Sequence, residues 1–295
     1  MATRAILVTG SDHHYYSYLI AAIDSLLEMR CSELADISVI DFGLLPDQRS
    51  EIMSRGLPIR KINKIEDPRK SALLRTVDTG LVLLPRMDLR DHFPGYDVYV
   101  WMDADLWVQT CDFLEPFIEG ARLRGAAVCL ENGPGYRFTE IEERWWRGQM
   151  VPLFGRIRGT YLGLLTSINI GVMALAAKAP HWDIWKRRYH QAVARLDRLD
   201  VDQHAFFAAL YLDRLDVKFL PAHYDWICTL STPNFDSQKS LFCIPDGGSN
   251  PISILHLAGP AKEREYEVPL LSGGKVLTKF TRDAALQLRE RFRAS

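Results

Sequence analysis

Two carboxylates placed one residue apart could bind a divalent cation. Asp103 and Asp105 close the apolar run that begins at Tyr99 in the stretch YVWMDADLWV. Burying two like charges side by side is costly unless a cation pairs with them, and a divalent metal ion is the usual solution. The commoner interpretation of an isolated D-x-D is structural, with Asp103 capping a helix and Asp105 exposed. The pair therefore needs support from elsewhere in the chain.

A second candidate group follows another apolar run, Ile252 to Leu255. This run ends in HLAGPAK, which contains His256, Gly259 and Lys262. A histidine beyond a strand end can be a metal ligand, a glycine permits close backbone approach, and a lysine offers a positive charge to phosphate. Alone, His256 would more often be structural. Together with the D-x-D pair it predicts a site with oxygen ligands and one nitrogen, which suits Mn²⁺ first and Mg²⁺ next.

The elements that must position these residues alternate between strand and helix patterns. Strands are expected at Ala5–Thr9, Asp36–Asp41 and Val98–Met102, and helices at Tyr18–Met29 and from Pro46 onward. The pattern predicts an α/β fold, with a mainly parallel open sheet and helices on both faces. Ligands bind beyond the carboxyl ends of such strands, where Asp103 and Asp105 lie. Both side chains point to the same side if the backbone there stays extended.

Residues 131–160 are expected to leave this core as a lid or an acceptor-facing segment. They are rich in glycine and contain Trp145 and Trp146 amid charged residues. The two indoles could stack on an acceptor sugar, although aromatic pairs more often serve packing. The core resumes at Ser167–Leu175, and another helix is expected to begin near Pro180. We expect one domain over residues 1–265, because the chain has no internal repeat or low-complexity linker.

The last segment, residues 266–295, is expected to be a basic amphipathic tail. Within Lys279–Ser295, apolar residues recur every four positions at Phe280, Ala284, Leu288 and Phe292. Arginines fall on the opposite face, so the helix could lie on an anionic membrane, which would suit a lipid-linked acceptor. The commoner alternative is a terminal helix that docks its apolar stripe on the core.

Composition narrows the classes of function. The 295 residues carry a net charge of −1, which argues against a general nucleic-acid binder. Five cysteines without metal-binding spacing are expected to be reduced thiols. No signal-peptide arrangement and no apolar run of about 18 to 20 residues is present, so a cytoplasmic protein is expected, with peripheral contact at the inner face of the membrane. The sequence sets no oligomeric state.

The order and spacing of four motifs resemble the family 8 glycosyltransferases. The motifs are D103-A104-D105, N169-I170-G171-V172-M173, D202-Q203 and H256-x-x-G259-x-x-K262. The opening ILVTGSDHHYYSYLIAAIDSLL and the segment DFGLLPDQ are similar to that family's first nucleotide-binding unit and its second strand, so the resemblance spans roughly residues 4–265. It implies a GT-A fold and a retaining, metal-dependent enzyme that uses a nucleotide sugar, usually a UDP-sugar.

The resemblance also assigns residues to the metal ion and the diphosphate. It implies that Asp103, Asp105 and His256 bind Mn²⁺ (or Mg²⁺), with Asp103 also near the ribose. Lys262 and the backbone of Gly259 would hold the diphosphate.

The remaining assignments concern the nucleoside and the sugar. The uridine pocket is implied to be lined by Thr9, Asp12 and Tyr15. The register between Ser11 and Tyr16 stays open by one position. Arg86 would contact the donor, with Arg90 as the alternative. The residues implied to surround the transferred sugar are Asn169, Asp202 and Gln203.

Four positions in three segments depart from the family's pattern. Glu131 stands where an aspartate is frequent, and its longer side chain could alter recognition of a sugar hydroxyl. His204 follows Gln203 where an acidic residue is frequent. Glu263-Arg264 follow Lys262 in place of Pro-Trp, which weakens expectations about the acceptor side of this loop.

The expected reaction moves a hexose to a hydroxyl of a glycan or lipid-linked acceptor, by analogy in the synthesis of surface polysaccharide or lipopolysaccharide. The amide of Gln203 is a poor nucleophile, so a front-face attack is favoured over double displacement, with Asp202 as a hydrogen-bonding partner of the sugar. Two alternatives remain. A sugar nucleotidyltransferase usually has a glycine-rich basic loop after the first strand, which GSDHHYY lacks, and a non-catalytic nucleotide-sugar binder would not need the complete metal triad.

Overall fold

A seven-stranded sheet forms the centre of the protein, with the order β3-β2-β1-β4-β7-β6-β8. The computed structural model describes residues 3–62, 85–136, 140–196 and 200–293. The strands are β1 (Ala5–Ser11), β2 (Asp36–Asp41), β3 (Ile59–Lys61), β4 (Val98–Met102), β6 (Ala126–Leu130), β7 (Ile168–Ala176) and β8 (Lys218–Leu220). Neighbours are parallel except where β7 runs antiparallel to β4 and β6. The predicted α/β fold with a mainly parallel sheet is confirmed.

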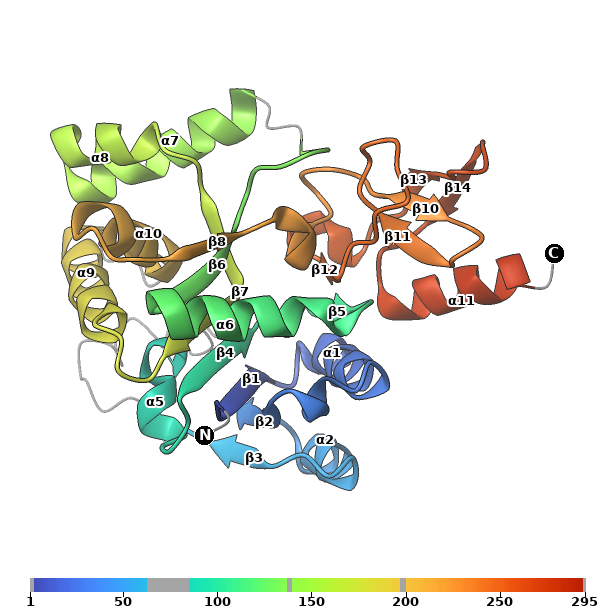
Figure 1. Cartoon of the computed structure of the whole chain (residues 1–295), viewed down its shortest axis with the longest axis horizontal. Helices are drawn as coiled ribbons and strands as arrows, with labels where there is room; N and C mark the ends of the chain where they lie inside the picture. The colour runs from blue at the N-terminus through green and yellow to red at the C-terminus, as the bar shows by residue number, and fades with distance from the viewer. Residues whose placement is uncertain (1–2, 63–84, 137–139, 197–199, 294–295) are drawn as a thin grey trace.

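Helices cover both faces of this sheet (Figure 1). On one face lie α1 (Tyr16–Glu28), α2 (Pro46–Ser54) and α6 (Leu114–Arg124), and on the other α7 (Glu140–Phe154), α8 (Arg156–Gly163), α9 (His181–Leu196) and α10 (Asp202–Leu212), with the short α5 (Leu89–His92) beside them. Each face of the sheet has its own hydrophobic core. Successive strand residues point to opposite faces, so Leu7 and Val100 lie in the core beneath α1, α2 and α6, whereas Val8 and Trp101 lie in the core beneath α7 to α10. This explains why the strands are apolar without alternation.

A smaller region packs beside the main sheet. It contains the three-stranded sheet β5-β12-β9, two hairpins and a terminal helix. Its elements are β5 (Leu106–Val108), β9 (Trp226–Ile227), β10 (Asn234–Asp236), β11 (Leu241–Cys243), β12 (Ile254–His256), β13 (Tyr266–Pro269), β14 (Lys275–Thr278) and α11 (Arg282–Arg293). A third core around Trp107 and Phe242 holds them together, and the Trp107 indole donates a hydrogen bond to the carbonyl of Phe280 at 2.7 Å.

The apolar stripe of the C-terminal segment lies against this third core. Phe280 is fully buried, Leu288 is 5% exposed, and the ring of Phe292 lies 5.8 Å from that of Phe235. The Arg289 guanidinium donates to the carbonyl of Ser240 at 2.9 Å. Of the two interpretations of this helix, the structure shows docking on the protein. Residues 294 and 295 of the segment lie outside the described residues.

The segment 131–160 contributes most of a helical hairpin, α7 and α8, which packs on the α9–α10 side of the sheet. Residues 137–139 lie outside the described residues. Gly159 lets α8 cross close to α7, because a Cβ there would come within 2.4 Å of the carbonyl oxygen of Met150. The two tryptophans separate: Trp146 is buried and stacks on His204 with ring centroids 5.3 Å apart, whereas Trp145 is 58% exposed.

The expectation that all five cysteines are reduced is wrong for one pair. Cys31 and Cys111 form a disulfide, with Cα atoms 5.8 Å apart. They lie 80 residues apart in sequence and meet because α1 packs against β5, where the Val108 amide donates to the Ser25 hydroxyl at 2.9 Å. The remaining cysteines are buried free thiols: Cys129, Cys228 and Cys243.

Among the described helices, none has both the length and the apolar character that crossing a bilayer requires.

Reduction should destabilise the protein measurably. The disulfide closes a loop of 80 residues, so the chain-entropy model expects its loss to lower the free energy of unfolding by about 4.5 kcal/mol. Urea unfolding with and without dithiothreitol measures this difference. A Cys31→Ala/Cys111→Ala variant should no longer respond to the reductant, and an equal response in that variant would contradict the pairing.

Candidate functional site

Strand pairing brings the three predicted metal ligands together. The chain leaves β4 at Met102, turns through Asp103 to Asp105, and enters β5, which belongs to the other sheet. In the antiparallel β5–β12 pair, His256 stands opposite Leu106, and the Leu257 amide donates to the carbonyl of Asp105 at 2.9 Å. The carboxylate pair and the histidine are therefore neighbours because of register, despite their distance in sequence.

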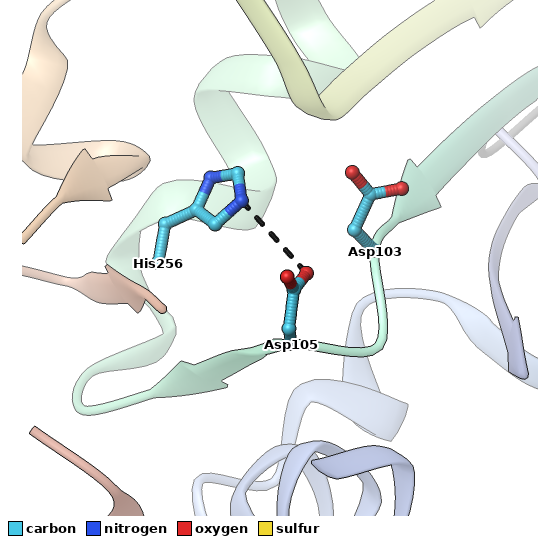
Figure 2. A group of neighbouring side chains, drawn as sticks. All are labelled: Asp103, Asp105 and His256. Carbon is cyan, nitrogen blue, oxygen red and sulfur yellow. Dashed lines mark ion pairs between the residues drawn. The ribbon is translucent and has the colours of Figure 1, made fainter. Parts of the chain in front are cut away.

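The backbone between the two aspartates turns instead of staying extended, so the condition for both side chains to point to the same side is not met. It turns because β4 and β5 belong to different sheets. The side chains still converge with His256 on one space, and ligand atoms from all three lie within 4.8 Å of one another (Figure 2). The His256 Nε2 atom is 3.8 Å from Asp105 Oδ1, too far for a hydrogen bond and close enough for both to contact one cation.

Lys262 stands on the other side of Asp105. Its Nζ lies 2.6 Å from Asp105 Oδ2 and 5.5 Å from the ring centroid of Tyr15. Gly259 begins the short turn that carries this lysine and has a φ of 55°, in the left-handed region that favours glycine. The turn thus places an ammonium group between the metal ligands and the loop after β1.

Arg86 connects the metal ligands to the start of α10. Its guanidinium Nε lies 2.9 Å from Asp202 Oδ2, and its NH1 lies 3.5 Å from Asp103 Oδ1. Both Arg86 and Asp202 are 4% exposed. Arg90 instead pairs with the exposed Asp183 at 2.5 Å. The structure therefore places Arg86, and not Arg90, beside the predicted site.

Asn169 begins a second polar group beside the first. Its Nδ2 donates to Glu131 Oε1 at 3.2 Å, and its Oδ1 accepts the Gly171 amide at 2.6 Å. Burial is the largest influence on Glu131 and raises its pKa to about 7. Gln203 lies partly exposed in the first turn of α10, directly after Asp202.

The residues predicted to contact the nucleoside lie at the end of β1 and the start of α1. Asp12 Oδ1 accepts the amides of His14 and Tyr15 at 3.0 and 3.1 Å, which shapes the loop into the helix. Tyr15 is exposed and faces Lys262. Thr9 is fully buried, so its side chain contacts the protein rather than solvent.

Sequence reasoning missed two residues that contact the predicted metal ligands. The buried carboxylate of Asp225 lies 2.9 Å from His256 Nδ1. The Trp101 indole donates to Asp103 Oδ1 at 2.5 Å. An aspartate inside the otherwise apolar and aromatic AHYDWI stretch was the available signal for Asp225, but its partner is set by strand pairing.

The electrostatics of the triad reflect burial among like charges. Burial is the largest effect on Asp103 and, with Asp105 nearby, raises its pKa to about 6 despite the opposing charge of Arg86. Burial lowers the pKa of His256, but the carboxylates of Asp225, Asp105 and Asp103 outweigh it and raise that pKa to about 9. Both shifts mark a pocket of negative charge, which a cation would relieve.

The donor set fits a divalent metal ion. Two carboxylates and one imidazole nitrogen match the preference of Mn²⁺, and of Mg²⁺ next, for oxygen-rich sites. Three protein ligands are fewer than the coordination number of either ion, so positions would remain for other oxygen ligands. The arrangement can therefore accommodate a diphosphate between a bound cation and the ammonium group of Lys262.

A cavity of about 230 Å³ opens beside Glu131. Its wall includes Trp146 and Arg147 from α7, Leu164 after α8 and Ser167 before β7. The segment predicted to face an acceptor therefore borders a hollow next to the Glu131–Asn169 pair.

Replacing Arg86 with methionine should strongly destabilise the protein. Asp202 and Asp103 would lose their buried cationic partner, and breaking one side of a buried pair costs about 3–5 kcal/mol. Urea unfolding in EDTA measures the loss. Arg90→Met is the control, since its surface pair contributes about 1 kcal/mol or less. Equal losses in the two variants would contradict the bridging role.

Glu131 should make stability depend on pH. Its folded pKa of about 7 exceeds the ordinary 4.5, so the folded state binds the proton more tightly and stability falls as pH rises between these values. Glu131→Gln should reduce this slope, as measured by urea unfolding across the range. Asp103 is present in both proteins, so the comparison isolates Glu131. An unchanged slope would show that the carboxyl is not held protonated.

Known structures share this architecture. The sequence matches no protein-family model and no curated protein sequence. The galactosyltransferase LgtC in complex with donor and acceptor sugar analogues superposes with a TM-score of 0.55 and 14% identity, over 98% of this chain and 94% of LgtC. An active-site mutant of LgtC superposes with a TM-score of 0.57 and 15% identity, over the same shares of the two chains.

A third structure, the WbbM bifunctional glycosyltransferase, has a TM-score of 0.53 and 11% identity, over 88% of this chain and 46% of WbbM. At these identities the likeness shows a shared fold. The chain therefore has the GT-A fold of these glycosyltransferases, as its resemblance to family 8 implies.

Proposed function

We propose that the protein is a metal-dependent retaining glycosyltransferase that moves a hexose from a nucleotide sugar, UDP-linked by preference, to a hydroxyl of a glycan or lipid-linked acceptor. One observation carries the proposal: two carboxylates and an imidazole converge at the carboxyl edge of a GT-A sheet, with Lys262 beside them. The enzymes that share the fold include a galactosyltransferase solved with donor and acceptor analogues.

The donor would bind across the carboxyl ends of β1 and β4. Asp103, Asp105 and His256 would hold Mn²⁺, which neutralises charge on the departing diphosphate when bound. Lys262 adds a second positive charge at the same place, and its contact with Tyr15 directs it toward the loop proposed to hold the uridine. These residues bind and orient the leaving group.

The sugar-binding side supports the front-face route. Asp202 Oδ2 is 2.9 Å from the Arg86 guanidinium and the residue is 4% exposed, so this carboxylate is engaged in a buried ion pair. A carboxylate held in that way is poorly available as a nucleophile. Asp202 would instead hydrogen-bond the sugar, with Asn169 and Gln203 beside it.

The acceptor would enter from the α7–α8 side. The cavity beside Glu131 offers a carboxylate, an arginine and the Trp146 ring, a combination that suits a saccharide. Ile157 on α8 is 87% exposed and Leu164 is 67% exposed, which favours an acceptor with a lipid anchor nearby. Membrane contact through Lys279–Ser295 would rely on arginines, because the apolar stripe is covered. We propose a place at the inner face of the cytoplasmic membrane, in polysaccharide or lipopolysaccharide synthesis.

A donor screen with metal and with chelator tests the proposal. The protein is incubated with UDP-glucose, UDP-galactose or UDP-GlcNAc, with Mn²⁺ or EDTA, and released UDP is measured. Asp103→Asn and Asp105→Asn should reduce release by more than about 100-fold, since losing only a residue that supports a metal ligand costs 10–100-fold. Asp246→Asn is the control, because Asp246 is a surface carboxylate that accepts only local bonds in its turn.

Three outcomes would contradict the proposal. No metal-dependent turnover or binding of any donor would overturn it. Pyrophosphate formed from a sugar phosphate and a nucleoside triphosphate would indicate a nucleotidyltransferase. Donor binding without turnover, even with glycan acceptors supplied, would indicate a non-catalytic binder.

A further inference from the structure

We propose that Asp225 is the positioning residue of the metal site: it fixes the ring of His256 so that Nε2 faces the two aspartates. The inference rests on the proposed metal site and extends it to a residue that contacts neither metal nor substrate. Asp225 lies in the segment just before β9, outside the four motifs that carry the family resemblance.

Both oxygens of Asp225 are committed to specific partners. Oδ1 accepts from His256 Nδ1 at 2.9 Å, and Oδ2 accepts the Val172 amide at 3.1 Å. The side chain of Asp225 has no exposed surface. A buried carboxylate that is fully hydrogen-bonded cannot rotate without losing a partner, so it is a fixed reference point for the imidazole.

The contact selects which nitrogen of His256 is available. A carboxylate only accepts, so Nδ1 keeps its proton, and Nε2 is the nitrogen that gives up its proton and offers a lone pair when a cation binds. Nε2 is the atom that faces Asp105, at 3.8 Å from Oδ1 (Figure 2). Metal-binding histidines are commonly oriented by a carboxylate on the other ring nitrogen, which also increases the basicity of the ligand.

Strand β7 also contacts the ring. A Cβ at Gly171 would lie 2.7 Å from His256 Cε1, so the imidazole is in contact with bare backbone there. The Gly171 carbonyl accepts the Asp103 amide at 2.8 Å, and the next residue, Val172, binds Asp225. Two adjacent residues of one strand therefore place an aspartate ligand and, through Asp225, the histidine ligand.

The register of the small sheet brings Asp225 to this position. β9 pairs in parallel with β12, with Ile227 beside His256, and the Cys228 amide donates to the carbonyl of His256 at 3.2 Å. The alternative is that Asp225 only stabilises the junction between β7 and β9. That role would affect folding but would not act on metal affinity through His256.

Isothermal titration with Mn²⁺ alone separates the two roles. Asp225→Asn should raise the Kd for Mn²⁺ by about 10–100-fold, because the amide orients and polarises the imidazole less well. Asp236→Asn is the matched control: Asp236 is also a buried carboxylate that accepts two backbone amides, but it lies in β10 and contacts none of the metal ligands. Its Kd should remain within about twofold of wild type.

A double-mutant cycle gives the decisive comparison. In a His256→Ala background, Asp225→Asn should change the Kd by less than about twofold, since the imidazole through which Asp225 acts is gone. The same 10–100-fold loss in both backgrounds would overturn the inference in favour of a structural role.

Two further results complete the test. Asp225→Glu keeps the charge while displacing it, so its Kd should lie between those of wild type and Asp225→Asn; if the asparagine variant fails to fold, a wild-type Kd for Asp225→Glu would overturn the inference. The readout is metal binding without a donor, so failure of glycosyl transfer does not affect it. A wild-type protein that binds no Mn²⁺ would overturn the metal site and this inference together.

Discussion

Like charges buried in one place are the constraint on which the rest of the structure depends. Asp202 and Asp225 are buried and Asp103 is half-buried, and each is matched with a cationic or hydrogen-bonding group. Arg86 serves the first two, and His256 serves the third. Since an unmatched buried charge costs several kcal/mol, the partners fix the conformations of the surrounding loops as firmly as apolar packing fixes the helices.

Two sheets meet at this cluster of charges. The main sheet supplies Asp103 at the end of β4 and the Gly171–Val172 backbone of β7. The small sheet supplies His256 on β12, and Asp225 lies directly before its strand β9. The chain passes from one sheet to the other within the Asp103–Asp105 turn. A hydrogen bond crosses this junction from the Val172 amide on β7 to Asp225 Oδ2 just before β9, and it ties the small sheet to the main one.

Local patterns in the sequence predict the parts of this site but not the contacts among them. The apolar runs that end in Asp103 and His256 identify strands and their carboxyl ends, because burial on both faces leaves a continuous apolar signature. The direction of β7, the partner of Asp225 and the Cys31–Cys111 bond depend on which distant segments pair. Neither the hydrophobic periodicity of the sequence nor its composition encodes that pairing. Trp145 and Trp146 show the same limit: adjacent residues on one helix have opposite environments.

The long separation in sequence between Asp105 and β12 has a consequence for synthesis. A ribosome releases the segment with Asp103, Asp105 and Arg86 long before it releases His256 and Lys262. Asp103 then already has Arg86 as a partner, whereas Asp105 still lacks both His256 and Lys262. The proposed metal site can therefore close only after β12 has been synthesised, so a chain interrupted between Asp105 and His256 would lack its third ligand.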